Sequence, residues 1–391
     1  MDFGFTEEQD QFRKEVQLFL KSEIETRSIT TRSHYFFYSN KTFSRKFAEK
    51  GWIGLTWPKQ YGGRGRSYVD RAILLEECLK VQTPLGFHFL GDRQVGPALI
   101  HFGTQEQKAK FLPQILNAEI SFCLLFSEPD AGSDLVSVRT SAIKDGDNYI
   151  LNGQKVWTSW GHQADFGWLL ARTDPDTPKK HQGLSEFIID MNSPGVTVQP
   201  IINIVGEHHF NEVFFDDVCI PKASLVGQEN RGFYQIMEQM DYERAGFERL
   251  MQNYPLYNRL LQYVKETHRN GAPLGLDPLV RDQIAKLEID FQAGRLFCYY
   301  VAWLLDQGKI PTYEAALCKS FCTQFEQQLT EVATQTMGPY GQLMPGSRYA
   351  PFDGEAAEIY LFSRSYTIQG GTVEILKNIV AQRGLNLPAY H

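Results

Sequence analysis

One predicted helix carries an acidic and a basic residue on the face that should be buried. After Gly232 the apolar side chains recur at helical spacing, but Glu243 and Arg244 take a step that an apolar residue should fill. A carboxylate on a buried face beside an arginine is either a structural ion pair or an acid/base group with a tuned pKa. The spacing by itself favours the ion pair and leaves the acid/base group open. The apolar positions that define this face are Ile236, Met240, Phe247 and Leu250.

Two residue pairs have the chemistry of metal ligands, but their spacing argues against a metal site. His208 and His209 are adjacent in a predicted strand, where successive side chains point to opposite faces. Cys318 and Cys322 lie one helical turn apart, with no further Cys or His cluster near them in sequence, so buried core thiols are favoured. The glycine-rich turn at 62–65 does not match the dinucleotide-binding pattern GxGxxG. The sequence therefore predicts no metal.

The composition excludes several classes of protein. The 391 residues include 39 Lys and Arg against 46 Asp and Glu, a net charge of −7, which argues against nucleic acid as a partner. Six cysteines spread over a long chain do not form a disulfide framework, and no apolar run is long enough to cross a membrane. The start, MDFGFTEEQDQF, resembles neither a secretion signal nor a transit peptide. We therefore expect a cytoplasmic protein without a membrane partner.

Aromatic residues are abundant, at 13% of the chain. Rings in this number can fill large cores, and they can also line an apolar ligand slot. The composition leaves both uses open.

The elements that must position these residues change character twice along the chain. The first helix is indicated by a capping box of Thr6 and Gln9, and helical spacing recurs over 69–80 and 105–116. From about residue 122 the segments become short, rich in β-branched and aromatic residues, and separated by turns, which predicts an antiparallel barrel or sandwich. The predicted strands cover 149–159, 166–172, 186–190, 195–201 and 211–220.

The helical period returns after Gly227. One long helix is predicted through the Glu243 stripe, with further helices over 287–305 and 321–337. This order predicts an α+β protein of three domains: a helical domain at 1–121, a β-barrel at 122–227 and a helical bundle at 228–391.

Several stretches in one order resemble the acyl-CoA dehydrogenase family, and together they cover nearly the whole chain. The most specific is LLFSEPDAGSD at 124–134. The others are GWIGLTWPKQYGG at 51–63, FGTQEQKAKFLPQI at 102–115, GDNYILNGQKVWTSWGHQAD at 146–165, HFNEVFFDDVCIP at 209–221, LVGQENRGF at 225–233 and IQGGTVEILKNIVAQR at 368–383.

The resemblance implies a fold, a cofactor and a reaction. The fold is an α-helical domain, a middle β-barrel and a C-terminal four-helix bundle, and the cofactor is non-covalent FAD. A base removes the proton α to a thioester carbonyl while flavin N5 accepts hydride from the β-carbon, and electron-transferring flavoprotein takes the electrons. Family members are usually homotetramers, so a homotetramer or dimer is expected.

The resemblance also assigns cofactor and substrate contacts residue by residue. Ser133 lies near the CoA chain as well as the flavin, and Trp157 and Ser159 match the groups beside the flavin ring. Gln335 begins a stretch that contacts the FAD of a neighbouring subunit. The full set of expected cofactor contacts is Leu124, Phe126, Ser127, Ser133, Trp157, Thr158, Ser159, Arg269, Gln335, Gly338, Pro339, Gly371, Thr372 and Glu374.

The family's usual base is missing at its usual place. Short- and medium-chain members carry it as the Glu of a Tyr-Glu-Gly-Thr motif, which reads Gln-Gly-Gly-Thr here and places Gly370 at that position. Another branch carries its Glu on the helix described above, just before an Arg. The resemblance therefore makes Glu243 the expected base, with Asp241 and Arg244 beside the substrate, and the Gly370 N–H a donor to the thioester oxygen. Glu374 is a weaker candidate base.

These departures bear on the substrate and on FAD. A glycine at 370 enlarges the pocket near the reacting carbons, so a branched, cyclic or otherwise bulky acyl-CoA is expected. The Arg-x-x-Phe-Gly stretch that usually contacts FAD is absent, and Arg269 is the candidate substitute. The layout resembles bacterial members that act on steroid side chains, some of which are heterotetramers of two paralogues. An oxygen-using oxidase and a non-catalytic partner subunit are the alternative functions.

Overall fold

The structure is a computed structural model that describes residues 4–26, 37–243 and 246–389, with the backbone alone described for 240–243. The chain forms two compact units. We call residues 39–65 and 85–243 the sheet unit, and residues 1–38, 66–84 and 244–391 the helical unit. The three domain boundaries expected from the sequence remain a proposal.

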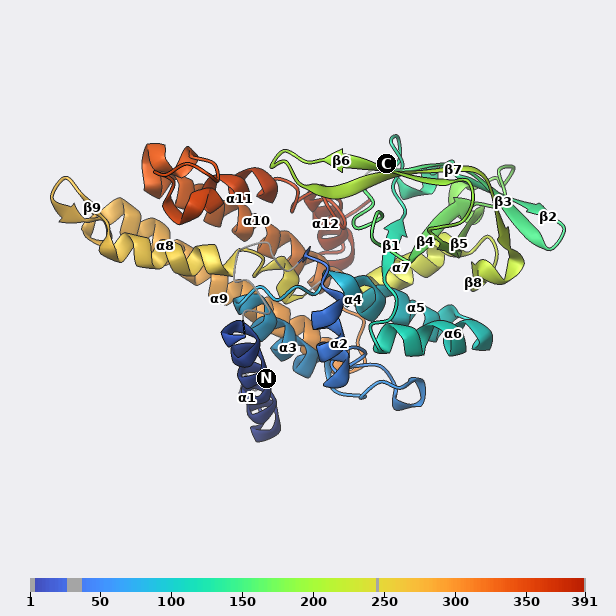
Figure 1. Ribbon diagram of the computed structural model, residues 1–391, viewed down its shortest axis with the longest axis horizontal. Helices are drawn as coiled ribbons and strands as arrows, with labels where there is room; N and C mark the ends of the chain where they lie inside the picture. Colours follow the sequence, from blue (N-terminus) through green and yellow to red (C-terminus); the bar gives the residue numbers. More distant parts are fainter. Residues whose placement is uncertain (1–3, 27–36, 244–245, 390–391) are drawn as a thin grey trace. The chain divides into compact units, whose positions relative to one another are not determined.

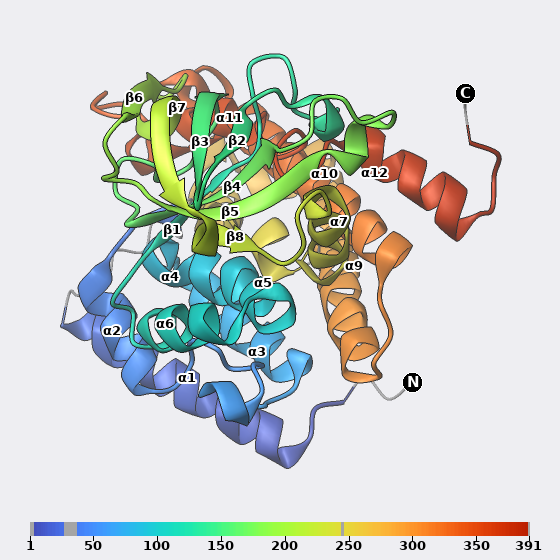
Figure 2. The ribbon, with the colours of Figure 1, turned by 90° about the vertical axis from the view of Figure 1, so that its right-hand side faces the viewer.

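The sheet unit is built around one mostly antiparallel sheet (Figure 2). Its strand order is β6-β7-β3-β2-β4-β5-β8, and β1 pairs in parallel with β4. Side chains from these strands form an apolar core that includes Leu151, Leu169 and Phe187. The strands are β1 (Phe122–Leu125), β2 (Ser141–Asp145), β3 (Asn148–Lys155), β4 (Phe166–Arg172), β5 (Leu184–Asp190), β6 (Val196–Ile202), β7 (His208–Pro221) and β8 (Leu225–Val226).

The sequence located five of the strands of this sheet, β3 to β7, with one end misplaced at a turn. The bounds of β4 are those predicted, but β3 ends at Lys155 rather than at 159. Trp157 and Trp160 both have φ near +60°, a conformation that a strand does not accommodate. β1 and β2 were not predicted, because each is too short to show a clear period.

One helix of the sheet unit begins at a clear sequence signal. α6 (Gln105–Leu116) has the predicted bounds and starts at a capping box between Thr104 and Gln107. A π-helical turn, Gly91–Val95, joins two shorter helices. The remaining helices of this unit are α2 (Lys41–Glu49), α4 (Gly86–Leu90), α5 (Gly96–Phe102) and α7 (Gly232–Glu243).

Long helices dominate the helical unit, in which α9 and α10 pack side by side (Figure 1). Both were predicted in part, and both extend beyond the predicted ranges. A short hairpin of β9 (His268–Arg269) and β10 (Ala272–Pro273) follows α8. The helices are α1 (Glu7–Glu25), α3 (Tyr68–Lys80), α8 (Tyr254–Glu266), α9 (Pro278–Asp306), α10 (Thr312–Met337), α11 (Glu355–Ser363) and α12 (Val373–Ile379). None of the helices in the described ranges is long and apolar enough to span a membrane.

The prediction of one long helix through 236–250 is wrong. α7 ends at Glu243, a single 3₁₀ turn covers Phe247–Arg249, and α8 begins only at Tyr254. Gly246 has an extended backbone, with φ 176° and ψ 170°, so the helical hydrogen-bond ladder cannot pass through it. Apolar residues keep their helical spacing from Ile236 to Leu250, so the spacing does not indicate that the helix ends between them.

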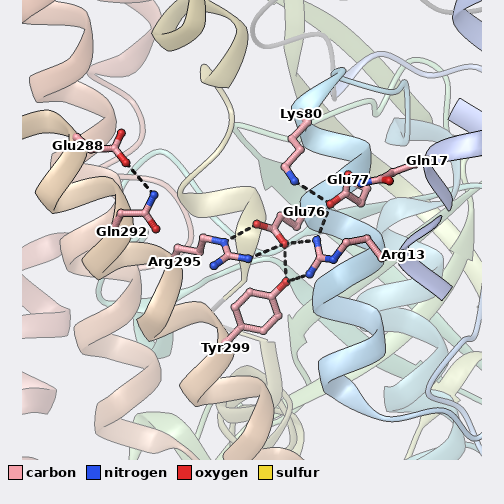
Figure 3. Close-up of polar contacts among 9 residues, drawn as sticks. All are labelled: Arg13, Gln17, Glu76, Glu77, Lys80, Glu288, Gln292, Arg295 and Tyr299. Atoms are coloured by element: carbon pink, nitrogen blue, oxygen red, sulfur yellow. Dashed lines mark hydrogen bonds and ion pairs between the residues drawn. The ribbon is translucent and has the colours of Figure 1, made fainter. Parts of the chain in front are cut away.

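A buried carboxylate ties three helices of the helical unit together (Figure 3). Glu76 of α3 accepts hydrogen bonds from Arg13 of α1 at 2.6 Å and from Arg295 of α9 at 2.6 Å. Tyr299 donates to the same carboxylate at 2.5 Å. Burial alone would raise the pKa of Glu76, but the hydrogen bond from Arg295 and the nearby positive charges lower it to about 2. The carboxylate is therefore ionised at neutral pH.

Candidate active site

A buried ion pair fixes the two segments of the sheet unit that the sequence assigns to the flavin. Lys155, at the end of β3, is fully buried and donates to Glu128 at 2.8 Å and to the Phe126 carbonyl at 3.0 Å. Val156 N–H donates to the Ser127 carbonyl at 2.9 Å. Burial lowers the pKa of Lys155 to about 8 although the charge of Glu128 opposes the shift. The loop after β1 and the segment after β3 are thus held side by side.

The expected contacts in the first of these segments differ in exposure. Leu124 lies on β1, and Leu124, Phe126 and Ser127 are half-buried, while Ser133 is exposed in the loop that follows. The sequence did not single out Lys155 or Glu128. The alternation of β3 could have indicated Lys155, because residues 151 and 155 point to the same face of the strand and Leu151 is buried.

The segment after β3 is anchored against the start of β7. Thr158 N–H donates to the Asn211 carbonyl at 3.0 Å, and the buried Asn211 side chain donates back to the Thr158 carbonyl at 2.9 Å. The Trp157 ring packs edge-on against Phe210 and is 60% exposed. Thr158 Oγ1 is buried and has no hydrogen-bond partner in the part of the chain that the structure describes. An exposed ring and an unsatisfied buried hydroxyl side by side suit a bound planar ligand.

A histidine of β7 supports the hydroxyl expected at the flavin edge. Ser159 Oγ lies 3.2 Å from His209 Nε2. Burial, together with the charges of His162 and His208, lowers the pKa of His209 to about 4, so its ring is neutral at neutral pH. His208 instead pairs with Asn211, at 2.7 Å. The adjacent histidines therefore have different partners, as expected for neighbours on a strand, and the role of His209 was not predicted.

The helix that carries the expected base is anchored to the sheet at its other end. Glu186 of β5 is fully buried and accepts hydrogen bonds from Gln235 at 2.7 Å and Gln239 at 3.1 Å, both on α7. The Trp168 indole donates to the same carboxylate at 2.6 Å. Burial raises the pKa of Glu186 to about 7 in spite of these three donors. These bonds fix the direction of α7 relative to β5.

The expected base itself lies beyond what the structure describes in detail. Glu243 is the last residue of α7, and its side chain and that of Asp241 are outside the described set. Arg244 lies entirely outside the described residues. Their assigned roles remain predictions.

The turn at Gly370 and Gly371 in the helical unit has the geometry of a backbone donor site. Both glycines have positive φ, at 65° and 94°. Lys319 of α10 is fully buried and donates from Nζ to the Gly371 carbonyl at 2.5 Å. Among the described residues, no group accepts a hydrogen bond from the exposed Gly370 N–H. Lys319 was not predicted, because the contact joins residues 52 positions apart.

The two other expected residues of this turn have different surroundings. Thr372 caps α12, and its hydroxyl accepts from the Ile375 N–H at 3.3 Å. Glu374 is exposed on the first turn of that helix.

The structure brings Arg269 to the stretch expected to contact FAD. Its Nη2 donates to the Thr336 carbonyl at 2.5 Å. Gln335 and Pro339 are exposed on either side, and Gly338 between them has φ 59°. Thr336 Oγ1 is buried and has no hydrogen-bond partner within the described ranges. Arg269 is thus held against the end of α10, beside the exposed Gln335.

Cys318 and Cys322 are buried, as predicted, and a third thiol joins them. Cys298 of α9 lies 3.8 Å from Cys318, and Cys318 lies 3.9 Å from Cys322. All three are core residues between two packed helices.

Three family models together match most of the chain. The acyl-CoA dehydrogenase N-terminal domain matches residues 6–119, the middle domain 123–218 and the C-terminal domain 230–385. The chain belongs to the acyl-CoA dehydrogenase family. The family fold, with helical N- and C-terminal domains around a middle β domain, is the one expected from the sequence.

Individual relatives share most of their length with this acyl-CoA dehydrogenase family member. Acyl-CoA dehydrogenase IpdE1 of Mycobacterium tuberculosis is 36% identical over 91% of this chain and 90% of its own. The solved structure of the Tcur3481-Tcur3483 steroid ACAD is similar with a TM-score of 0.88, at 28% identity over all of both chains. The ChsE4-ChsE5 complex from Mycobacterium tuberculosis is similar with a TM-score of 0.87, at 28% identity and the same coverage.

Proposed function

We propose that this protein is an FAD-dependent acyl-CoA dehydrogenase that introduces an α,β double bond into a bulky acyl-CoA thioester. The observation that carries the proposal is in the sequence: Gly370 replaces the Glu of the usual base motif, and a Glu-Arg pair stands at 243–244. The Gly370 turn, described within its own unit, has the positive φ of a backbone donor turn. One element supplies an N–H for the thioester oxygen, and the other supplies the base.

Glu243 is the proposed base. It removes the proton from the carbon α to the thioester carbonyl, a weak acid whose deprotonation needs a positioned carboxylate. Hydrogen bonds from Gln235 and Gln239 to Glu186 hold the helix on which Glu243 stands. Glu374, exposed on α12, is the weaker candidate.

Gly370 is the proposed oxyanion donor. Removal of the α-proton moves negative charge onto the thioester oxygen, and a fixed N–H directed at that oxygen stabilises it. The bond from the buried Lys319 to the Gly371 carbonyl keeps the turn in one conformation. The donor is therefore in place before substrate arrives.

The residues of the sheet unit fit a flavin. When bound, FAD supplies the acceptor for the hydride that leaves the β-carbon. The exposed Trp157 ring would flank the ring system, and the buried Thr158 hydroxyl and Ser159 would supply polar contacts. In the helical unit, Arg269 and the adjoining stretch that includes Gln335 would hold the adenosine half of the FAD of a neighbouring subunit, replacing the missing arginine motif.

The bulky acyl group follows from Gly370 and is supported by relatives. Where straight-chain members carry a Glu side chain, this chain carries none. One similar solved structure is titled a steroid ACAD, and a more distant relative is an isovaleryl-CoA dehydrogenase, 28% identical over 97% of this chain. We propose electron-transferring flavoprotein as the electron acceptor.

The test is anaerobic bleaching of the flavin by a panel of straight, branched, cyclic and steroid acyl-CoAs. We expect the wild type to bleach with bulky substrates and Glu243→Gln to keep its FAD without bleaching. Glu238→Gln is the matched control, because Glu238 lies on the same helix and pairs with His101 at the surface. Bleaching of Glu243→Gln at the wild-type rate would refute the base assignment and direct attention to Glu374.

A half-site subunit of a heteromeric enzyme is the second candidate. The titles of two similar solved structures each name two chains, Tcur3481-Tcur3483 and ChsE4-ChsE5. If this chain is such a subunit, it should be colourless when purified alone and should retain FAD only after co-expression with a paralogue. A yellow preparation that bleaches by itself excludes this candidate.

A further inference from the structure

Three buried cysteines of the helical unit bring their sulfur atoms together. Cys298 lies on α9, and Cys318 and Cys322 lie one turn apart on α10. Cys318 Sγ is 3.8 Å from Cys298 Sγ and 3.9 Å from Cys322 Sγ, and all three sulfurs lie within 4.8 Å of one another. The sequence spacing argued against a metal because only two of these cysteines are close along the chain. The fold supplies the third.

The packing of α9 against α10 sets the positions of the sulfurs. Gly294 lies one turn before Cys298 and so shares its face of α9. A Cβ on Gly294 would lie 2.6 Å from Leu250 Cδ1 and 3.5 Å from Cys322 Sγ, so the glycine keeps space open beside the sulfurs. All three thiols are at most 3% exposed. The cluster is therefore held by two packed helices rather than by a loop.

The sulfur separations match those around a thiolate-bound metal. A metal in one plane with three sulfurs, at bond lengths of about 2.3 Å, holds the sulfurs about 4.0 Å apart. Thiolates select soft cations such as Cu(I) and Zn(II), and structural Zn(II) almost always takes four ligands. Among the described residues, no His, Asp or Glu adds a ligand atom to this group. A set of three sulfurs thus favours Cu(I), which is stable with three ligands.

Clustering also changes the proton affinity of one thiol. Burial raises the pKa of Cys78 and Cys123, the two buried cysteines outside the cluster, to about 12. Hydrogen bonds from Cys298 and Cys322 instead lower the pKa of Cys318 below its usual value, although it is equally buried. The thiolate is the form of cysteine that binds a metal. The cluster therefore favours that form where a lone buried cysteine does not.

We propose that Cys298, Cys318 and Cys322 form a binding site for a soft monovalent cation of the Cu(I) class. Each sulfur binds as a thiolate, so the cation replaces the thiol protons, which pass to water, and no oxidation state changes. The bound cation joins α9 to α10 and stabilises the folded state by its binding free energy. The site is independent of the proposed function, because none of the three cysteines is an expected contact of FAD or substrate.

The test is copper retention by the purified holoprotein under anaerobic conditions. Copper is supplied both by incubation with Cu(I) and by expression in copper-supplemented medium, because buried sulfurs are more accessible while the chain folds. Loosely held copper is then removed with the Cu(I) chelator bathocuproine disulfonate. We expect one copper per chain, three sulfur neighbours by X-ray absorption spectroscopy, and a higher melting temperature than that of the copper-free protein.

Single substitutions assign the copper to the cluster. Cys318→Ala and Cys298→Ala should each bind Cu(I) at least tenfold more weakly and lose the rise in melting temperature. Cys123→Ala and Cys219→Ser are the controls, one buried and one exposed outside the cluster, and should retain copper as the wild type does. FAD content and far-UV circular dichroism verify that each variant is folded.

Four outcomes would overturn the inference. The first two are no copper retained after either way of loading, and retention by Cys318→Ala equal to that of the wild type. The third is a copper ion whose neighbours are nitrogen or oxygen. The fourth is retention of Zn(II) in preference to Cu(I), which would refute the assigned class of cation. None of these results bears on the dehydrogenase proposal, which flavin bleaching tests separately.

Discussion

The buried carboxyl group of Glu326 should make the protein less stable at high pH. Glu326 is fully buried on α10, and its two oxygens accept from the backbone and side chain of Asn253 at 3.3 and 2.6 Å. Burial raises its pKa from the usual 4.5 to about 8 against the effect of these hydrogen bonds. The change we consider is Glu326→Gln, which keeps the shape and cannot ionise.

The size of the effect follows from the pKa difference between the folded and unfolded chain. The folded state holds the proton more tightly, so it gains protons relative to the unfolded state between pH 4.5 and 8. The free energy of unfolding is therefore highest below pH 4.5 and falls as the pH rises toward 8. A shift of 3.5 pKa units (8 minus 4.5) corresponds to about 5 kcal/mol at about 1.4 kcal/mol per unit.

The glutamine should fit the site after one local adjustment. Asn253 Oδ1 is buried and has no hydrogen-bond partner among the described residues. A flip of the Asn253 amide would direct this oxygen at the new side-chain NH₂. We therefore expect Glu326→Gln to match the wild type within about 1 kcal/mol at pH 5, where Glu326 is already neutral.

The assay is urea unfolding of both proteins at several pH values from 5 to 9, with excess FAD throughout. The variant should become progressively more stable than the wild type above pH 5, by several kcal/mol at pH 9. Glu331→Gln, on the same helix but near the surface, should show no such trend. A constant difference between wild type and Glu326→Gln across the whole range would refute the reasoning.

Three further substitutions test the site and its support. Lys155→Met should lower the free energy of unfolding by about 3 to 5 kcal/mol, because it leaves the buried Glu128 without its cation. It should also lower the FAD-to-protein absorbance ratio, and an unchanged FAD content would contradict the anchoring role. Glu76→Gln should lower the free energy of unfolding by about 3 kcal/mol, because Arg13 and Arg295 lose the anion that they share. An unchanged midpoint of urea unfolding would contradict this prediction. Gly370→Ala should lower the free energy of unfolding by about 1 to 2 kcal/mol, because its positive φ is strained for a residue with a Cβ. It should also slow flavin bleaching by shifting the proposed N–H donor, and wild-type bleaching would contradict the donor role.

The family and most elements could be predicted because the relevant information is local or ordered along the chain. The capping box at Thr104 and the period of its helix give α6 its bounds, and turn residues on either side give β4 its bounds. The motif around Ser127 and the sequence Gln-Gly-Gly-Thr around Gly370 are short contiguous motifs, so they can be recognised without a structure. The helix break after Glu243 was missed because apolar spacing persists through it.

The aromatic residues also show the difference between what the sequence predicts and what the fold decides. The sequence left open whether the rings fill cores or line a ligand site. Phe187 and Phe247 are fully buried in core, whereas Trp157 presents most of its ring to the surface beside an unsatisfied hydroxyl. Only the fold separates these two uses, because burial depends on which elements pack against each ring.

The sequence by itself determined the family, the succession of a helical, a β and a second helical region, and the presence of Gly370 where the usual base would stand. The tertiary structure decided which groups surround those positions: Lys155 with Glu128 between the two segments expected to bind the flavin, Lys319 on the Gly371 carbonyl, and Arg249 beside Gly370. Each of these contacts joins residues at least 27 positions apart. Local periodicity carries no information about such pairs, since they meet only when packing of the elements brings distant segments together.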